Sequence, residues 1–353
     1  MINPVHDKDV WTRRIRTVLI TMLLCLVAAE FASRIFWYYQ LDVPLLHPGR
    51  IFYAYYPELK TVDAVQPSHA DDYYNILFLG GSVLHPEWGQ IEQDMSEDLD
   101  TIASKSGHKK VRIFNLAFPS HTSRDSLLKY AALDKARFDL VIVYHGLNEV
   151  RANNVPPDLF RDTYDHYSWY QIVNVLSAYS DAVFALPYTL HYIGLVLWQR
   201  LHSEDYVPTD FPRPEWTAYG KDPRSVLPFR HNIESILETA SKRNDHVLLV
   251  TFALHIPKNY TLRKFWNREL DYATSILRLP VETWGEREHV AATVALHNDV
   301  IRKIAATHPD VHLFDMARNL PKSHRCFDDP CHLTAEGCVL FATMLDKMIV
   351  EHW

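Results

Sequence analysis

Five short apolar runs, separated by longer segments with helical spacing, constrain the fold of this chain more than any other feature. Each run is continuous and ends at turn residues, which is typical of a strand buried on both faces of a parallel sheet. The runs lie at 75–79, 111–115, 139–144, 246–252 and 311–314. Apolar residues spaced three and four apart predict helices over 88–102, 127–133, 233–240, 290–306 and 335–350. This alternation predicts an α/β domain with a parallel sheet covered by helices on both faces.

Length and charge narrow the classes of protein. The 353 residues allow one large domain or two small ones, and a hydrophobic content of 48% fits a chain that folds mostly as a globule. The net charge of −7 gives no reason to expect nucleic acid as a partner. Parallel α/β sheets place their sites at the carboxyl ends of the strands, so functional residues are expected at those ends.

The N-terminal segment carries a membrane signal. An uninterrupted apolar stretch at 18–29 follows a basic flank made of Arg13, Arg14 and Arg16. The stretch reaches the roughly 20 residues of a membrane span only if it extends over 15–39, with Glu30 and Arg34 paired one helical turn apart. The aromatic residues at 36–39 resemble the interfacial belt of such a span.

Basic residues that flank a membrane span stay in the cytoplasm, and this sets the orientation. Residues 1–14 are therefore predicted to be cytoplasmic and 15–39 to be a single-pass signal anchor in the inner membrane. The remainder of the chain is predicted to be periplasmic or otherwise extracytoplasmic. A cleaved signal peptide is the main alternative, and a buried amphipathic helix is another.

The exported part divides further. Residues 40–72 lack clear periodicity and predict a membrane-proximal linker that packs loosely, and 73–353 form the α/β domain. An insert at 151–230 interrupts the strand–helix alternation, and two of its stretches are largely apolar. Polar groups and a proline within them argue against a second span. The insert is expected to form a helical cap over the site, near the bilayer, or simply an extra helical pair, and it is a candidate surface for an envelope protein partner.

A serine follows the first predicted strand. Gly80 and Gly81 precede Ser82 and allow a tight turn that brings substrate close to its hydroxyl. The position after a strand and before a helix exposes the hydroxyl near free N–H groups, which suits a nucleophile. The alternative is an ordinary turn that caps the next helix.

A histidine and an acid lie near the C-terminus. His332 is the candidate general base for Ser82, and Asp329, three residues earlier, is the candidate acid that orients the imidazole. Asp328 is a competing choice for the acid. The alternative for the whole motif is a capped helix start with an exposed histidine.

Two more strand ends supply donors for an oxyanion hole. The amide of Asn148, after the third strand, and the backbone N–H of Ser120, after the second, would join the N–H of Ser82 around a developing oxyanion. Taken singly, each segment is also typical of an ordinary turn. Together they indicate a functional site, because all of them lie at strand ends of one predicted sheet.

Together these residues resemble the SGNH (GDSL-type) hydrolase superfamily, whose signature residues are serine, glycine, asparagine and histidine. Ser82 matches the nucleophile, Asn148 the oxyanion asparagine, and Asp329 with His332 the family's acid–base pair. The resemblance covers residues 73–353 apart from the insert and implies a flavodoxin-like fold with a Ser-His-Asp triad. Ser120 departs from it, because glycine is usual there, and the oxyanion hole is expected to be altered by the loss of glycine's freedom in φ.

The resemblance implies an exported, membrane-anchored serine esterase, deacetylase or acyltransferase. Its expected substrate is an acylated small molecule, glycan or lipid of the cell envelope, and Trp88, His121 and His145 are candidates for the border of an acceptor cleft. The alternative is a catalytically inactive scaffold or binding subunit of an envelope complex, which the Ser120 departure and the large insert would favour.

No cofactor or metal ion is expected. Four histidines follow strand ends and would line the crevice, but no metal-binding motif supports a site; they are His85, His121, His145 and His255. Three of the four cysteines cluster around the Asp329 motif with a spacing unlike that of zinc sites. In an oxidising compartment Cys326 and Cys331 would be close enough in sequence to pair, and free thiols are the alternative.

Overall fold

The computed structural model describes residues 4–70, 72–106, 109–207, 211–275 and 278–352. The chain divides into two compact units. We call residues 1–57 together with 168–204 the N-terminal unit, and residues 58–167 together with 205–353 the sheet unit. The 151–230 insert is therefore split, because its middle part belongs to the N-terminal unit and its two ends to the sheet unit.

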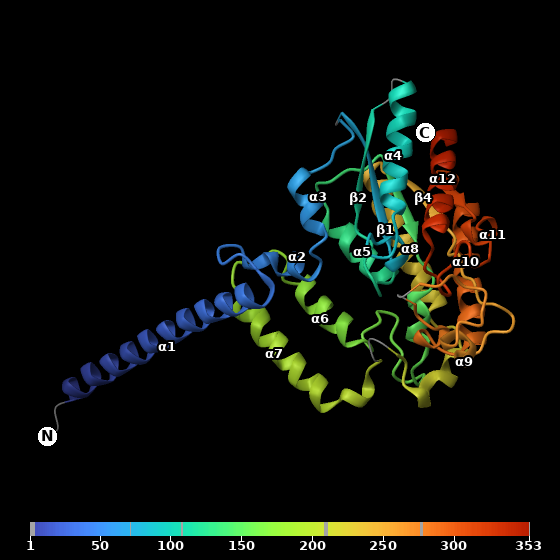
Figure 1. Cartoon of the computed structure of the whole chain (residues 1–353). Helices are drawn as coiled ribbons and strands as arrows, with labels where there is room; N and C mark the ends of the chain where they lie inside the picture. Colours follow the sequence, from blue (N-terminus) through green and yellow to red (C-terminus); the bar gives the residue numbers. More distant parts are fainter. Residues whose placement is uncertain (1–3, 71, 107–108, 208–210, 276–277, 353) are drawn as a thin grey trace. The chain divides into compact units, whose positions relative to one another are not determined.

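The sheet unit is built on five parallel strands in the order β2-β1-β3-β4-β5 (Figure 1). The strands are β1 (Tyr73–Gly80), β2 (Lys110–Asn115), β3 (Leu140–Tyr144), β4 (His246–Val250) and β5 (Val311–Phe314). Every residue of the central strand β3 is buried, as expected for a strand covered on both faces. The predicted parallel α/β fold and all five predicted strands are confirmed.

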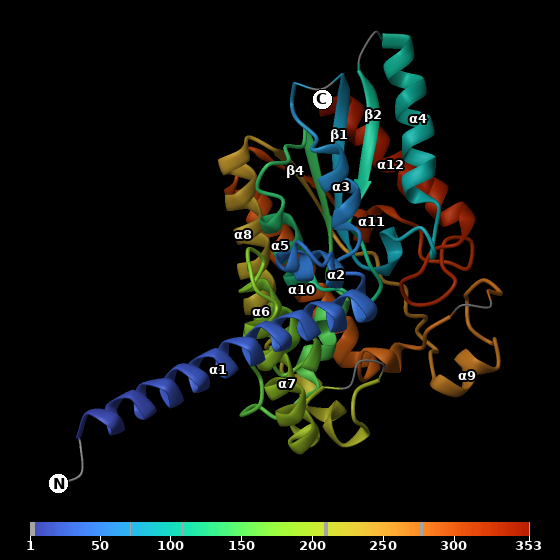
Figure 2. The ribbon, with the colours of Figure 1, turned by 90° about the vertical axis from the view of Figure 1, so that its left-hand side faces the viewer.

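Helices cover both faces of this sheet. Figure 2 shows α4 and α12 together on one side, with α5, α8 and α10 on the other. Their bounds are α4 (Ile91–Ser106), α5 (Ser123–Ala132), α8 (Val226–Arg243), α10 (Arg287–Thr307) and α12 (Ala335–His352). Shorter helices are α3 (Leu59–Val65), α9 (Leu262–Trp266) and α11 (Met316–Asn319). Single 3-10 segments are η2 (Ser82–Leu84), η3 (Asn148–Asn153), η5 (Pro214–Lys221) and η6 (Val281–Thr283).

One helix begins later than predicted. The spacing predicted a helix from Trp88, but α4 begins at Ile91 and Trp88 lies in a turn. Gly89 follows this turn, and a β-carbon there would lie 2.7 Å from the sulfur of Cys338 in α12. The close approach of α12 therefore requires glycine at this point, and Trp88 is left outside the helix, near the strand ends.

The N-terminal unit contains one long helix and several shorter ones. The long helix α1 (Pro4–Leu41) precedes η1 (Pro48–Arg50) and α2 (Ile51–Tyr55), and the insert contributes α6 (Ser168–Ser177) and α7 (Leu186–Leu201). Its core combines the end of α1 with the insert helices and contains Trp37, Val43, Ile51, Leu176, Ala185 and Tyr188. Of the two apolar stretches of the insert, 188–201 coincides with α7, whereas α6 overlaps only the first part of 172–186. The segment η4 (Ser203–Asp205) follows α7.

Residues 40–72 are more ordered than the sequence predicted. They contain η1, α2 and α3, and Phe52, Tyr56 and Leu59 in them are fully or nearly fully buried. Helices α2 and α3 have only five and seven residues, which is too short for a repeating apolar pattern to be recognised in the sequence. The boundary between the two units falls within this segment, after Pro57.

Among the described residues, one helix is long and apolar enough to cross a membrane. It covers Val10–Leu41 with a mean hydropathy of 2.0, and none of its most apolar window is buried in the structure. The predicted pairing of Glu30 with Arg34 is confirmed, with 2.6 Å between Oε1 and Nε. The N-terminus therefore carries a long apolar helix of the kind found in signal anchors and signal peptides.

The two charges that interrupt this apolar helix have a structural role within the unit. The Glu30 carboxylate accepts the backbone N–H groups of Ala185 and Leu186, at the start of α7, at 2.9 and 2.8 Å. Arg34 donates to the carbonyl oxygens of Leu45 and Val183. An acidic group at the N-terminus of α7 satisfies free N–H groups and favours the helix dipole. The ion pair thus holds the turn that precedes α7 against α1.

Trp37 lies in this junction and not on the outer surface. Its side chain is only 2% exposed, its Nε1 donates to Thr189 Oγ1 at 2.8 Å, and its ring packs against Tyr188 and Tyr192. The aromatic cluster at 36–39 was predicted to form an interfacial belt, and for Trp37 that interpretation is wrong, because the indole belongs to the core of the N-terminal unit.

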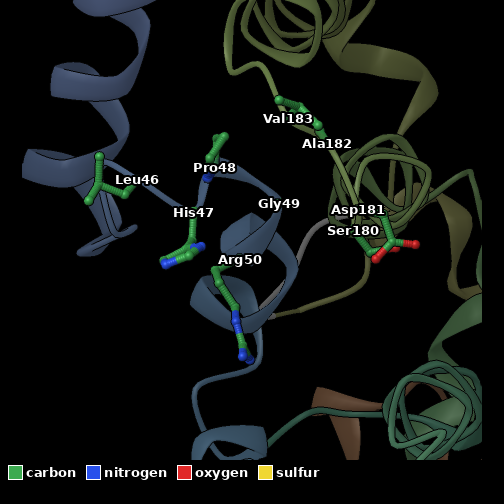
Figure 3. Close-up of a pocket in the computed structure, with 9 residues that line it drawn as sticks. All are labelled: Leu46, His47, Pro48, Gly49, Arg50, Ser180, Asp181, Ala182 and Val183. Atoms are coloured by element: carbon green, nitrogen blue, oxygen red, sulfur yellow. The ribbon is translucent and has the colours of Figure 1, made fainter.

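A pocket of about 270 Å³ lies between two turns of the same unit (Figure 3). One turn carries Leu46 to Arg50 and the other carries Ser180 to Val183. The turns approach closely at Gly49, where a β-carbon would lie 2.6 Å from the carbonyl oxygen of Ser180. The pocket lies beside this contact, near the N-terminal end of α7.

Candidate active site

Ser82 lies just after the end of β1, in the 3-10 turn Ser82–Leu84. The two preceding glycines permit the close approaches that this turn needs. A β-carbon at Gly80 would lie 2.8 Å from Leu84 Cδ1, and one at Gly81 would lie 2.8 Å from Asn148 Nδ2. The next long helix begins only at Ile91, so the helix N-terminus predicted beside Ser82 is reduced to this short turn.

The structure brings Ser82 and His332 together although 250 residues separate them. Ser82 Oγ lies 2.8 Å from His332 Nε2, and His332 Nδ1 lies 2.6 Å from Asp329 Oδ2. A carboxylate only accepts, so Nδ1 carries the proton and Nε2 is left to accept from the Ser82 hydroxyl. His332 and Asp329 are buried, while Ser82 is half-buried. This is the geometry of a serine nucleophile, its base and an orienting acid.

Asp329 is held as an anion by its surroundings. Its Oδ1 accepts the backbone N–H groups of Cys331 and His332, and its Oδ2 also accepts that of Leu279. Burial alone would raise the pKa of this carboxyl, but its electrostatic interaction with His332 and the hydrogen bonds from His332 and Cys331 outweigh burial and lower the pKa below its ordinary value. The acid is therefore ionised when it faces the imidazole.

Asp328, the competing candidate, has a different role. Its backbone N–H donates to the carbonyl oxygen of His332, which closes the loop that carries the histidine. Burial and the neighbouring Asp329 charge raise the pKa of Asp328 to about 6. The geometry thus places Asp329, and not Asp328, on the imidazole Nδ1.

Trp88 contributes a contact that the sequence did not reveal. Its ring stacks on the His332 imidazole, with centroids 3.9 Å apart and planes inclined by 20°. The contact depends on the turn at 86–90, which the helical spacing of this segment conceals. Together with Asp329, it fixes the plane of the imidazole.

Asn148 faces the Ser82 turn in a single orientation. Trp284 Nε1 donates to Asn148 Oδ1 at 3.1 Å, and an indole N–H can only donate, so the amide oxygen is identified. Asn148 Nδ2 donates one hydrogen to the carbonyl oxygen of His121 at 2.9 Å. An amide nitrogen has two hydrogens, so the second remains available beside Gly81 for an oxyanion.

Ser120 adopts the backbone conformation that glycine favours. Its φ is 66°, in the left-handed region, so serine is held here in a conformation that glycine adopts more readily. The loop before it runs along β1, because the N–H groups of Leu116 and Phe118 donate to the carbonyl oxygens of Phe78 and Gly80. This pairing carries Ser120 to the same strand end as Ser82.

A fully buried lysine holds this loop from beneath. Lys129 Nζ, on α5, donates to Glu58 Oε1 at 2.9 Å, to His121 Nδ1 at 3.1 Å and to the carbonyl oxygen of Leu116. Burial lowers the pKa of Lys129, and the Glu58 carboxylate opposes that effect. Burial, together with the Lys129 charge, lowers the pKa of His121 to about 3, so this imidazole is neutral and accepts from the lysine.

A second buried group lies beside Asn148. Glu149 is fully buried and its Oε1 accepts the backbone N–H of Ser123 at 2.6 Å, at the start of α5. Burial raises the pKa of Glu149 to about 7. His145 lies near it and hydrogen-bonds Ser126 Oγ through Nε2 at 2.7 Å. The segments that follow β2 and β3 are therefore both anchored to α5.

These contacts correct the expected roles of the histidines. His121, His145 and His255 are buried, so they do not border an open crevice, and His85 is half-buried with its ring against Phe118. Among the described residues, one group could offer three metal ligands, namely Asp329, Cys331 and His332. The Asp329 and His332 atoms in it already share a hydrogen bond, so a cation there would compete with the triad. All four cysteines are free thiols in the structure.

The model of the GDSL-like Lipase/Acylhydrolase family matches residues 78–339. The chain belongs to this family. Its members are ester hydrolases, and the match spans the Ser82 turn, Ser120, Asn148, Asp329 and His332.

Several solved structures are similar to the chain at low sequence identity. The acetyl xylan esterase AlAXEase is 16% identical, over 78% of this chain and 99% of its own, with a TM-score of 0.41. A lipase/acylhydrolase from Enterococcus faecalis is 15% identical, over 78% and 94%, with a TM-score of 0.39. A GDSL-like lipase from Bacteroides thetaiotaomicron VPI-5482 is 14% identical, over 86% and 100%, with a TM-score of 0.43. No curated protein sequence matches the chain significantly.

Proposed function

We propose that the chain is an exported, membrane-anchored serine esterase, deacetylase or acyltransferase that acts on an acylated polysaccharide or lipid of the cell envelope. The observation that carries the proposal is the continuous relay from Ser82 through His332 to Asp329, with distances of 2.8 and 2.6 Å. The base and the acid are shielded from water, whereas the nucleophile is half-buried and within reach of a substrate.

The relay defines the chemical steps. Ser82 Oγ attacks the ester carbonyl carbon while His332 Nε2 takes the hydroxyl proton, and Asp329 stabilises the imidazolium that forms. The carbonyl oxygen becomes an oxyanion, which the N–H groups of Ser82 and Ser120 and the Asn148 amide would stabilise. Collapse of this intermediate expels the alcohol, which receives the proton from Nε2. Water then releases the acyl group in hydrolysis, or an acceptor hydroxyl takes it in transfer.

The surroundings of Ser82 support an acylated sugar or lipid as substrate. Trp88 is half-buried above His332, and Phe118, which is 38% exposed, lies beside His85. Flat rings of this kind present apolar faces that suit a sugar ring or an acyl chain. These exposed rings define the proposed class of substrate. Hydrolysis and transfer share one acyl-enzyme intermediate and differ in the acceptor of the acyl group.

The packing of α1 supports an anchor that is not cleaved. Glu30, Arg34 and Trp37 tie the last three turns of α1 to the segment around 183–189. A peptidase needs an extended, accessible chain, and this stretch is helical and partly buried. Together with the basic residues before position 17, this packing favours a single-pass protein with a cytoplasmic N-terminus.

The experiment is active-site labelling of the full chain in lipid nanodiscs with a fluorophosphonate probe. Labelling is expected for the wild type and is expected to be lost in Ser82→Ala and in His332→Ala. Ser96→Ala, on α4 and away from the relay, is the matched control and should label normally. Release of acetate from acetylated xylan or chitin fragments would then test the glycan class. A well-folded wild type that does not label would support the inactive scaffold instead.

A further inference from the structure

The outer face of α7 carries a continuous apolar stripe. Its members are each about half exposed or more, with Leu201 at 80%, and they are Leu190, Ile193, Leu197, Trp198 and Leu201. Spacings of three and four place them along one side of the helix. From Ala182 to Gln199 the chain contains no Asp, Glu, Lys or Arg. A helix that faced water on this side would carry polar residues there.

The opposite face of α7 is already used inside the N-terminal unit. Tyr188 and Thr189 are buried against the end of α1, and Gln199 Nε2 donates to the carbonyl oxygen of Ser168 on α6 at 3.1 Å. The apolar stripe is therefore not the side by which α7 joins its own unit. It is an additional apolar surface that the unit leaves exposed.

The stripe begins beside the apolar helix α1. Glu30 caps α7 directly, and Figure 1 shows α1 and α7 meeting near the C-terminal end of α1 and diverging from there. The preceding part of α1 also exposes large apolar side chains, among them Leu23 and Leu24, each more than half exposed. One unit thus presents two apolar helical surfaces that start from the same junction.

The margins of the stripe are basic or amphipathic. Arg200 and His191 lie at its two edges, both exposed, and Trp198 places an indole along one of them. At the N-terminal end of α7, Leu46 and Val183 are strongly exposed at the rim of the pocket of Figure 3, next to His47 and Arg50. Apolar side chains with a cationic and aromatic border are typical of a helix at a lipid headgroup boundary.

We infer that α7 is an interfacial helix, whose apolar stripe is buried in the outer leaflet of the bilayer that α1 crosses. The inference rests on the proposed membrane anchoring. The occupant is lipid because the stripe is a helix face without charge and starts at the same junction as the exposed apolar surface of α1. A second copy or a protein partner is the competing occupant, and the experiment separates the two.

The test places spin labels on the full chain in nanodiscs of phosphatidylethanolamine and phosphatidylglycerol, with one protein in each disc. Cys25→Ser removes the exposed native thiol, and the remaining thiols of Cys326, Cys331 and Cys338 are buried. In this background Leu197→Cys and Leu190→Cys report the stripe, Leu23→Cys reports α1, and Ala295→Cys reports an exposed site on α10, with the background protein itself as the labelling blank. Collisions with oxygen, which concentrates in lipid, are compared with collisions with a water-soluble nickel chelate. The ratio should be several-fold higher at the stripe than at Ala295, and highest at Leu23.

Each outcome decides a different point. A label at Leu197 that behaves like that at Ala295, while Leu23 stays in lipid, overturns the inference and leaves the anchor intact. Water accessibility at both Leu197 and Leu23 would instead contradict the proposed membrane location. Protection at Leu197 from both reagents, with spin–spin broadening when two copies share a disc, would assign the stripe to a second copy and also overturn the lipid assignment.

Discussion

The two sides of the candidate site are held in place by different means. On the base side, Asp329 and His332 are three residues apart, and one carboxylate binds the imidazole and the backbone of its own loop. On the oxyanion side, the loop before Ser120 is held by Lys129, whose ion partner Glu58 is 71 residues away. The pairing of acid and base is thus local, although Trp88 and Leu279 add contacts from distant segments, whereas the oxyanion side depends mainly on tertiary structure. Substitutions should therefore affect chemistry on one side and position on the other.

The largest effect is expected from Asp329→Asn. The asparagine amide can donate to Nδ1, where the carboxylate could only accept, and this favours the imidazole tautomer with its proton on Nε2. His332 then cannot accept the Ser82 proton, so kcat should fall by about 10³–10⁴-fold. Steady-state hydrolysis of a nitrophenyl ester measures it. Asp328→Asn is the matched control, since Asp328 contacts the loop through its backbone, and it should change kcat by less than about threefold. Equal losses of kcat in both variants would mean that the conformation of the loop, and not the Asp329 carboxylate, determines activity.

A smaller loss of activity is expected from Lys129→Met. Methionine fills the space but removes the Lys129 donor from Glu58, His121 and the Leu116 carbonyl, so the oxyanion loop loses this support. We expect kcat to fall by about 10–100-fold, less than the roughly 10²–10³-fold loss that follows complete removal of one oxyanion donor, with little change in KM. Breaking a buried ion pair should also lower the free energy of unfolding by about 3–5 kcal/mol.

The double variant Lys129→Met with Glu58→Gln separates these two consequences. Removal of both charges should restore part of the lost stability, because no uncompensated carboxylate remains. It should not restore kcat, since the loop is still without its donor. Recovery of both quantities together would show that Lys129 acts only on stability and does not position Ser120.

These two sides also show what the sequence could reveal. The spacing of Asp329 and His332 and the five apolar runs were sufficient to predict the pair and the sheet, because both depend on near neighbours. Lys129 stands between Leu128 and Tyr130 on a predicted helix, where a single lysine is usually interpreted as a solvated position. Its complete burial follows from the packing of α5 beneath the loop, and no local pattern records that packing.

The N-terminal unit also combines contacts that the sequence predicted with contacts that it could not. The pairing of Glu30 with Arg34 followed from their separation by one helical turn. Their bonds to Ala185, Leu186 and Val183 join segments about 150 residues apart in the chain, so they could not be predicted. Trp37 was assigned to a membrane belt for the same reason, because its partners Tyr188 and Thr189 lie in the distant insert.

The oxyanion side should also make stability depend on pH. The pKa of Glu149 is raised to about 7 in the folded protein, above its ordinary value, so the folded state keeps a proton that the unfolded chain loses. The contribution of Glu149 to stability should therefore fall as pH rises from about 4.5 to about 7, by up to roughly 3 kcal/mol, while buried His121 and His145, whose pKa is lowered to about 3, contribute in the opposite sense. Urea unfolding at a series of pH values measures this slope. Glu149→Gln, which keeps the acceptor for Ser123, should make stability rise more steeply with pH over this range than it does in the wild type, and an identical slope in the two proteins would contradict the prediction.

The smallest effect is expected from Ser120→Gly. Serine in the left-handed region costs about 1 kcal/mol, and glycine removes that cost while also making the unfolded chain more flexible, so the net change should be within about 1 kcal/mol. Asn244, which ends α8 with a φ of 58°, is the control, because asparagine tolerates this conformation and Asn244→Gly should change stability less. The Lys129 contacts, and not the identity of residue 120, are expected to determine the conformation of this loop. The kcat of Ser120→Gly should therefore stay within about twofold of that of the wild type. A large rise in kcat would instead mean that the serine distorts the oxyanion hole and that the buried lysine compensates only in part.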